Sequence, residues 1–348
     1  GGDSAEVALE LMPGNKIRKY DTWHAMGQGA TTGSLVVTLE ALKEMHLTPE
    51  DIQLIQNDTK TCPDTGMAGA SRSLYMDGNA TIIAANKLLA AMRKEDGTLR
   101  TYDEMKAEGI ETKYLGRYET NTTPGLCRLD PNTGIGDPTP AFTYCLNLAE
   151  VEVDTKTGKT TVLKFTCVDF VGRIGNIDAV NGQAYSGIMH GIGFALKEDY
   201  ADVKKHANMF GAGTSYIKDV PDDINLIHID GAISDGPFGS SGASEAFQAS
   251  GHCAVLNGIY NACGVRIHEI PALPEKVKAG LDAIAKGEKP YEPKKYFLGS
   301  DMYEELENIK ENPVQVGTQS FYVSLDDPTA ERPFYSDSEE ECVAAHEA

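Results

Sequence analysis

The sequence is poor in positive charge and contains no long apolar run. Among its 348 residues, 31 are Lys or Arg and 52 are Asp or Glu, which gives a formal net charge of −21 at pH 7. A chain with this charge repels a phosphate backbone, and no local stripe of Lys and Arg offsets the repulsion. No segment reaches the roughly 18 consecutive apolar residues that a membrane-spanning helix needs. We therefore expect neither nucleic acid nor a membrane among its partners.

Paired cysteine motifs are also absent. The seven cysteines are scattered and odd in number, and none forms the C-x-x-C pattern of a zinc site, an iron–sulfur cluster or a redox-active dithiol. Thiols in this arrangement are typical of a reduced, cytoplasmic protein. We therefore expect a cytoplasmic chain, and we expect any iron–sulfur cluster that serves it to lie on a partner or on a segment outside this sequence.

Several nucleotide-binding and catalytic motifs are missing or incomplete. The sequence holds no P-loop, no G-x-S-x-G nucleophile motif and no H-E-x-x-H zinc motif. The dinucleotide fingerprint begins at Gly27 and Gly29, but its third glycine is due at position 32, which is Thr32. These absences count against a serine hydrolase, a protein-ligated zinc and an NAD-dependent dehydrogenase.

What the sequence does contain is three loops of small residues, each leading into a segment with helical spacing. They cover residues 26–30, 68–72 and 236–245. The first backbone N–H groups of a helix have no partner within the helix, so three such loops can grip a large anionic cofactor. The third loop ends in Glu245, a single carboxylate that could serve as a base beside that cofactor. The plainer alternative is that Glu245 only stabilises the start of its helix.

The hydrophobic pattern predicts an α+β fold of mixed sheets with packed helices, because strands and helices alternate without a regular βαβ period. Strands or hairpins are expected at residues 5–22, 53–56, 149–163, 224–229 and 265–270. Helices are expected at residues 31–47, 71–92, 179–196, 244–263 and 274–286, with a short one near 302–309. We expect one region of two interlocked subdomains over residues 1–286 and a polar, acidic extension over residues 287–348.

The amino-acid sequences of these loops, taken together with other segments, are specific enough to indicate a family. The relevant stretches are G-Q-G-A at 27–30, D-T-K-T-C-P-D-T-G at 58–66, A-G-A-S-R at 68–72, G-N-A at 78–80, G-I-G at 191–193 and G-P-F-G-S-S-G-A-S-E at 236–245. In this order they resemble the molybdenum hydroxylase family of xanthine dehydrogenases and aldehyde oxidoreductases, above all its bacterial molybdopterin-dependent aldehyde oxidoreductases. The resemblance extends from near residue 3 to about residue 281.

This resemblance implies the second molybdopterin-binding domain of the family and a molybdenum–molybdopterin cofactor, with the cytosine dinucleotide form as one option. No side chain is expected to ligate the metal, which the family holds through the pterin dithiolene. Thirteen residues match cofactor-contacting positions of the family: Met26, Gly27, Gln28, Gly29, Ala30, Gly69, Ala70, Ser71, Arg72, Gln183, Ser240, Ser241 and Gly242.

The resemblance also implies a reaction, the hydroxylation of an aldehyde or heteroaromatic C–H with oxygen from water, and it places Glu245 at the catalytic base. The alternative is a non-catalytic cofactor-carrying or assembly module of the same fold. Because the chain begins in mid-pattern, we expect the N-terminal half of the molybdenum region and an iron–sulfur domain or subunit as partners, with a flavin subunit as a further option. Aldehydes, purines and N-heteroaromatic acids remain open as substrates.

The sequence departs from the family pattern at four positions of these segments. Met26 stands where close relatives can have histidine, and His190 stands where glutamine is common. Ala70 and Ser244 replace glycines expected in aldehyde oxidoreductases. At Met26 and His190 the departures affect contacts that side chains would make with the cofactor, but not contacts made by the backbone. Ala70 and Ser244 make their loops slightly bulkier.

Overall fold

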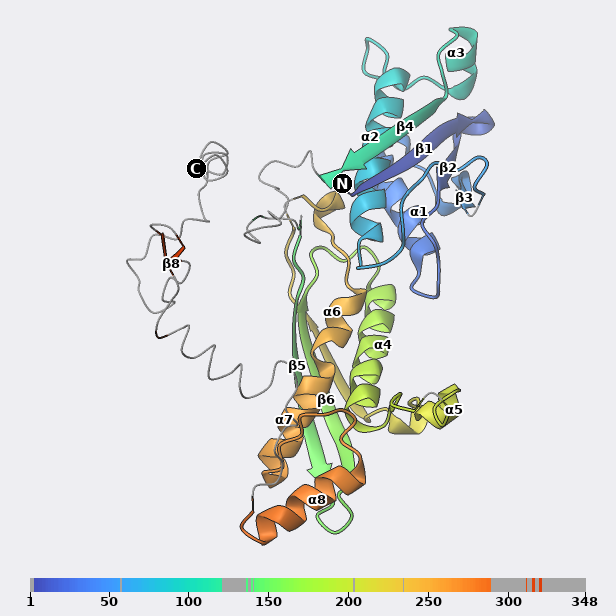
Figure 1. The fold of residues 1–348 in the computed structure, drawn as a ribbon. Coiled ribbons are helices and arrows are strands. Elements are labelled where there is room, and N and C mark those ends of the chain that lie inside the picture. The colour runs from blue at the N-terminus through green and yellow to red at the C-terminus, as the bar shows by residue number, and fades with distance from the viewer. Residues whose placement is uncertain are drawn as a thin grey trace. The chain divides into compact units, whose positions relative to one another are not determined.

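The structure, a computed structural model, describes residues 3–56, 58–120, 136, 139, 141–202, 204–233, 235–288, 311, 315–316 and 319–320. The chain divides into two compact units, Gly1–Leu281 and Asp282–Ala348. The first unit holds two sheets with helices packed on them, which is the expected α+β architecture (Figure 1). In the second unit, β8 (Gln315–Val316) pairs with β9 (Gln319–Ser320). The helix expected near residues 302–309 lies outside the described residues.

The first sheet has four strands in the order β3-β2-β1-β4. The strands are β1 (Ser4–Met12), β2 (Lys16–Asp21), β3 (Ile52–Gln56) and β4 (Lys113–Glu119). The hairpin predicted over residues 5–22 is confirmed: β1 and β2 pair antiparallel around Gly14, whose φ of 76° favours glycine. Strand β3 adds in parallel to β2, which places the carboxyl ends of these two strands side by side.

Two helices pack on this sheet, α1 (Ala30–Ala41) and α2 (Ser73–Met92). Helix α2 lies directly against β4, because a Cβ at Gly116 would overlap the carbonyl oxygen of Ala80. The buried core between them includes Leu9, Ile17 and Leu88. Helix α1 ends at Ala41, earlier than the helix predicted over residues 31–47, and a short 3₁₀ turn at Lys43–Met45 follows it.

The second sheet has three strands in the order β5-β6-β7. Strand β5 (Tyr144–Val153) pairs antiparallel with β6 (Thr160–Phe170), and β7 (Asp223–His228) pairs in parallel with β6. Helices α4 (Ile177–Leu196), α6 (Ser244–Ala249) and α7 (Gly251–Cys263) pack on one face of it (Figure 1). Helices α4 and α6 approach closely, since a Cβ at Gly187 would lie 2.6 Å from the Cβ of Phe247.

Three parts of the predicted element order are wrong or incomplete. The helix predicted over residues 244–263 is two helices, separated at Ser250, whose φ of −121° and ψ of 1° are not helical. Among the described residues, 265–270 form no strand: Val265 and Ile267 are buried by side-chain packing, which gives them the alternation of a strand without a ladder. Strand β4 and the four-residue helix α5 (Met209–Ala212) were not predicted.

A short helix, α3 (Tyr102–Ala107), lies between α2 and β4. Thr101 caps it: Thr101 Oγ1 accepts from the Glu104 N–H at 3.3 Å, and the Glu104 carboxylate accepts from the Thr101 N–H at 2.8 Å. Helix α8 (Pro274–Ala285) begins at a proline, as predicted.

Candidate functional site

All three loops of small residues border one cavity of about 710 Å³ in the first unit. This volume is within the range of roughly 300–1,000 Å³ that is typical of small-molecule and cofactor sites. Ten of the predicted site residues line it from the three loops: Met26, Gln28, Gly29, Ala30, Gly69, Ser71, Ser240, Ser241, Gly242 and Glu245. The predicted Gln183 also lines it, from helix α4. Gly27, Ala70 and Arg72 do not border the cavity.

The first loop connects β2 to α1 and is held in shape by its own glutamine. The Gln28 side chain donates from Nε2 to the carbonyl oxygen of His24 at 2.7 Å and accepts at Oε1 from the N–H of Met26 at 2.5 Å. Gly27 and Gly29 have φ values of 107° and 83°, which only glycine adopts without strain. Met26 is 71% exposed, so its side chain is free to meet a ligand or a partner.

The second loop precedes α2 and is strained. Ala70 and Ser71 both have a φ of 52°, in the left-handed region where a side chain costs roughly 1–2 kcal/mol. Ala70 is one of the two positions where the sequence lacks an expected glycine. Strain of this kind persists only where the surroundings hold it, and it is commonly found at ligand-binding sites.

The third loop rests on the second. A Cβ at Gly242 would overlap the carbonyl oxygen of Ser71, so only glycine fits there. Ser71 Oγ donates to the Glu245 carboxylate and accepts from the Glu245 N–H at 3.2 Å. Ser240 and Ser241 tie the loop to the segment after β6: Ser240 Oγ donates to the carbonyl oxygen of Arg173 at 2.6 Å.

Glu245 lies in the first turn of α6, is exposed, and borders the cavity. Its carboxylate accepts a hydrogen bond from Ser71 of the neighbouring loop rather than from an N–H of its own helix. The capping alternative therefore gains no support from these contacts. A carboxylate in this position can accept a proton from a molecule in the cavity, and the Ser71 hydroxyl limits its orientations.

The Arg72 side chain is bonded to the protein on several sides. Its guanidinium pairs with Asp3 and donates to the carbonyl oxygens of Met67 at 2.7 Å and Ser4 at 3.1 Å. The side chain is only 12% exposed. These contacts tie the second loop to the beginning of β1, and a contact between the guanidinium and a cofactor stays a prediction.

Several further side chains line the cavity and were not predicted, among them Trp23, Arg173 and Phe238. Trp23 is buried and follows β2, three residues before Met26. Phe238 has a φ of 54° and is 38% exposed, so the third loop holds an aromatic ring at the cavity in a strained conformation. Phe238 could have been predicted as a cavity residue, because it lies inside the G-P-F-G segment of the third loop.

Backbone donors converge on this cavity from all three loops. Among the described residues that border the cavity, the N–H groups of Gln28, Gly29, Gly69, Ser71, Gly242 and Ala243 make no hydrogen bond to the protein. Such groups at the ends of loops that start helices bind anionic ligands. The donor set fits a large ligand with anionic groups that is gripped mainly by the backbone.

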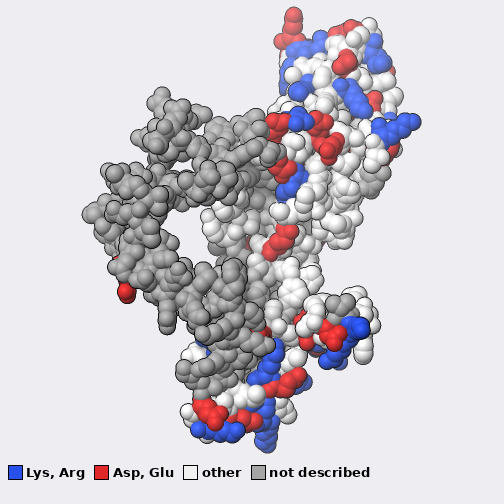
Figure 2. Space-filling view, in the orientation of Figure 1, with Lys and Arg blue, Asp and Glu red and all other residues white. Residues whose placement is uncertain are grey.

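Other kinds of site find less support in the part of the chain that the structure describes. There, no three His, Cys, Asp or Glu side chains come together in a group that could hold a metal ion. No helix among the described residues is long and apolar enough to cross a membrane. On the face drawn in Figure 2, basic and acidic side chains are interspersed over the described surface.

The chain belongs to the molybdopterin cofactor-binding domain family, whose model matches residues 1–221. An aldehyde oxidoreductase of Megalodesulfovibrio gigas is 41% identical over 283 residues, which cover 81% of this chain and 31% of that protein. The crystal structure of the aldehyde oxidoreductase from Desulfovibrio desulfuricans matches with a TM-score of 0.77 and 44% identity, covering 80% of this chain and 30% of that one.

A more distant solved structure shares the fold alone. The quinoline 2-oxidoreductase of Pseudomonas putida matches with a TM-score of 0.63 at 20% identity, covering 80% of this chain and 38% of that one. This chain therefore spans about a third of the length of the relatives that it matches.

Proposed function

We propose that this chain supplies one wall of a molybdenum–molybdopterin site in an oxidoreductase that hydroxylates an aldehyde or heteroaromatic C–H with oxygen from water. The observation that carries the proposal is that three loops with unpaired backbone N–H groups border one cavity, and that Glu245 of the third loop also lines it. Membership of the molybdopterin cofactor-binding domain family supports the identity of the cofactor.

The backbone N–H groups of the three loops would hold the anionic groups of the cofactor, and the Gln183 amide would meet its pterin edge. Backbone contacts do not depend on side chains, so Met26 in place of histidine leaves this grip intact. The nucleotide form is a separate question. The mass of the extracted cofactor would distinguish molybdopterin from its cytosine dinucleotide.

Glu245 would act as the general base. When bound, the cofactor supplies a site that activates water and accepts two electrons from the substrate. The protein then has to remove a proton. Two carboxylates line the cavity, Glu40 of α1 and Glu245, and Glu245 is the one held between the second and third loops by Ser71. The Ser71 hydroxyl would orient this carboxylate, and the buried Trp23 would help to keep bulk water from one side of the cavity.

The function requires parts that this chain does not supply. Electrons have to leave the site, and we propose that they pass to iron–sulfur centres on a separate domain or subunit, with a flavin subunit as a further acceptor. We also propose that the N-terminal half of the molybdenum region closes the cavity. The matched part of this chain covers only about a third of these relatives, which is consistent with such partners.

The test is co-expression of the chain with that N-terminal half, followed by metal analysis and pterin fluorescence after denaturation. Stoichiometric molybdenum and pterin, with oxidation of aldehydes by an artificial electron acceptor, would support the proposal. Molybdenum and pterin without turnover on aldehydes, purines or N-heteroaromatic acids would favour the non-catalytic alternative. A complex that holds neither molybdenum nor pterin would reject the proposal, and retention of NAD would favour a dehydrogenase instead.

A further inference from the structure

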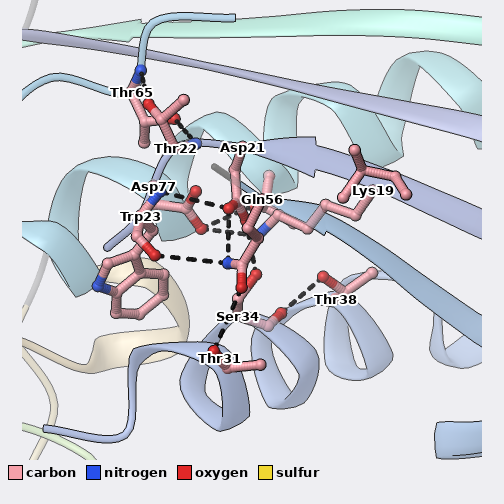
Figure 3. A network of polar contacts seen from close by, with 12 residues as sticks. Lys19, Asp21, Thr22, Trp23, Thr31, Ser34, Thr38, Gln56, Thr65 and Asp77 are labelled. Atoms are coloured by element: carbon pink, nitrogen blue, oxygen red, sulfur yellow. Dashed lines mark hydrogen bonds and ion pairs between the residues drawn. The ribbon is translucent and has the colours of Figure 1, made fainter. Parts of the chain in front are cut away.

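A network of charged side chains is fully buried beneath the first loop (Figure 3). Lys19 Nζ donates to Asp77 Oδ1 at 2.7 Å and lies 3.2 Å from Asp21 Oδ2, and the three side chains are 0% exposed. Burial raises the pKa of Asp77 to about 6, with Lys19 opposing the rise and Asp21 adding to it. A buried ion pair is by itself weak evidence of stability, because the cost of removing both charges from water opposes their attraction.

Asp21 joins the elements on both sides of the first loop. Its Oδ2 accepts from Ser34 Oγ of α1 at 2.7 Å, and its Oδ1 accepts from Gln56 Nε2 at the end of β3 at 2.7 Å. Oδ1 also accepts from the N–H of Trp23 at 3.3 Å. The Asp21 carboxylate is therefore bonded to Trp23, at the start of the first loop, and to Ser34 of α1, the helix that follows this loop (Figure 3).

Asp77 connects this network to the other two loops. It lies in the second turn of α2, directly after the second loop, and accepts from Thr81 Oγ1 at 3.3 Å. Its neighbours contact the third loop: Asn79 Nδ2 donates to the carbonyl oxygen of Asp235 at 3.0 Å, and a Cβ at Gly78 would lie 2.6 Å from Pro237 Cγ. Residues 77–79 of α2 therefore contact the segments that hold the first and third loops, and they directly follow the second loop.

We propose that Lys19 and Asp77 are positioning residues, whose buried ion pair fixes strand β2 against helix α2 and so sets the three cofactor-binding loops in their relative places. Lys19, Asp21 and Asp77 do not line the cavity themselves. The inference rests on the proposed function, because it concerns the same loops, but its primary test does not need the cofactor.

Trp23 provides a reporter for this test. It is the single tryptophan of the sequence, it is 7% exposed, and it lines the cavity. Its N–H is bonded to Asp21, and its indole ring packs so closely that a Cβ at Gly33 would lie 3.1 Å from Trp23 Cη2. Movement of the first loop would expose this ring to water and to a quencher.

The experiment compares the full 348-residue chain with the Lys19→Met variant. We expect Trp23 emission at longer wavelength, easier quenching by acrylamide, and exchange of the amide hydrogens of residues 22–30 and 68–72 that is faster by at least about tenfold, because two buried carboxylates lose their cation. Asp77→Asn serves as the second variant, since it removes one charge with little change in shape, and it should give the same changes if Lys19→Met fails to fold.

Leu88→Ala is the matched control, because Leu88 is 0% exposed on the same helix α2 and takes no part in the network. It should lower stability while leaving Trp23 emission and the exchange of residues 22–30 as in the wild type. Unchanged Trp23 emission and exchange in a folded Lys19→Met or Asp77→Asn protein would overturn the inference. Equal changes in Leu88→Ala would also overturn it, because they would reflect lost stability alone.

Co-expression with the N-terminal half then separates the two proposals. We expect Lys19→Met to reduce pterin occupancy below that of Leu88→Ala, and equal occupancy in the two variants would overturn the link to the cofactor. If the wild-type complex binds no pterin while Lys19→Met still alters Trp23, the proposed function fails and the positioning of the loops stands.

Discussion

At the scale of single residues, Glu245 is where the proposed chemistry can be tested most directly. In the loaded complex, Glu245→Gln should reduce kcat by roughly 10²–10⁴-fold, because the amide keeps the size of the side chain but cannot accept a proton. Molybdenum and pterin content should stay near the wild-type value. Steady-state kinetics and metal analysis on the same preparation measure both quantities.

A matched control exists elsewhere on the chain. Glu275 also lies in the first turn of a helix, α8, and is exposed. Glu275→Gln should leave both kcat and cofactor content unchanged. If Glu245→Gln keeps more than about a tenth of the wild-type kcat, Glu245 is not the base.

Asp77 makes the stability of the fold depend on pH. Burial raises its pKa from the ordinary 3.8 to about 6, so the folded chain binds this proton more tightly than the unfolded chain does. This contribution to the free energy of unfolding is fully present below about pH 4 and is lost as the pH rises through 6, by about 3 kcal/mol at most. Urea denaturation of the wild type and Asp77→Asn between pH 4 and pH 8 measures it.

The expected result is that the difference in unfolding free energy between the two proteins changes with pH only in that window, in the direction that favours the wild type at low pH. The matched change is Asp96→Asn, since Asp96 is an exposed carboxylate whose pKa is lowered by hydrogen bonds from Thr98. The difference in unfolding free energy between Asp96→Asn and the wild type should not change as the pH rises through 6. A wild type and an Asp77→Asn variant with parallel pH profiles would contradict the assignment.

At the scale of elements, the close contact between the second and third loops predicts a sensitive glycine. Gly242→Ala should lower the free energy of unfolding by roughly 1–3 kcal/mol, because the added methyl group overlaps the Ser71 carbonyl and forces the loops apart. It should also lower pterin occupancy in the co-expressed complex. Chemical denaturation and pterin fluorescence measure the two effects.

Gly182→Ala provides the comparison within the same cavity region. Gly182 lies in helix α4 with no heavy atom within 4 Å of an added Cβ, so this change should stabilise the chain by roughly 0.5–1 kcal/mol. Should Gly242→Ala behave like Gly182→Ala, the two loops do not meet as described.

Local patterns predicted those elements whose packing follows from their own sequence. The alternation around Gly14 predicts the first hairpin, and the apolar spacing of residues 71–92 predicts α2. Strand β4 escaped prediction because the apolar Leu115 lies on the same face as Lys113 and Arg117, and because the buried face carries Gly116, whose place against α2 depends on packing. The division at Ser250 was also hidden, because apolar spacing continues through it.

The same limit applies to the site. The glycines and Glu245 were found because loop composition and a family resemblance are local features of the sequence. The Arg72–Asp3 pair joins residues 69 positions apart, and the Lys19–Asp77 pair joins residues 58 positions apart. No periodicity connects such residues, so their partners appear only once the sheet and α2 are packed together.

At the scale of the whole molecule, one face of the second sheet remains apolar and exposed. Tyr144, Leu146 and Leu148 alternate along β5 and are 64%, 63% and 56% exposed. The ladder places Leu146 beside Val168 of β6 and Val168 beside Ile227 of β7, so the apolar row crosses all three strands. The helices α4, α6 and α7 pack on the opposite face. An apolar surface of this kind marks a place of association.

We expect this face to make the isolated chain self-associate, or to join it to the N-terminal half of the molybdenum region when both are present. Leu146→Asp should therefore raise the monomer fraction of the isolated chain and weaken co-purification of that half, because it places a charge at the centre of the apolar row. Sedimentation velocity and molybdenum content of the co-expressed complex are the measurements.

Thr161→Asp adds the same charge at an exposed position of β6 outside the row, and it should change neither the monomer fraction nor the co-purification. A wild-type chain that sediments as a stable monomer, holds stoichiometric molybdenum and oxidises substrate would show instead that the cavity is complete within these residues.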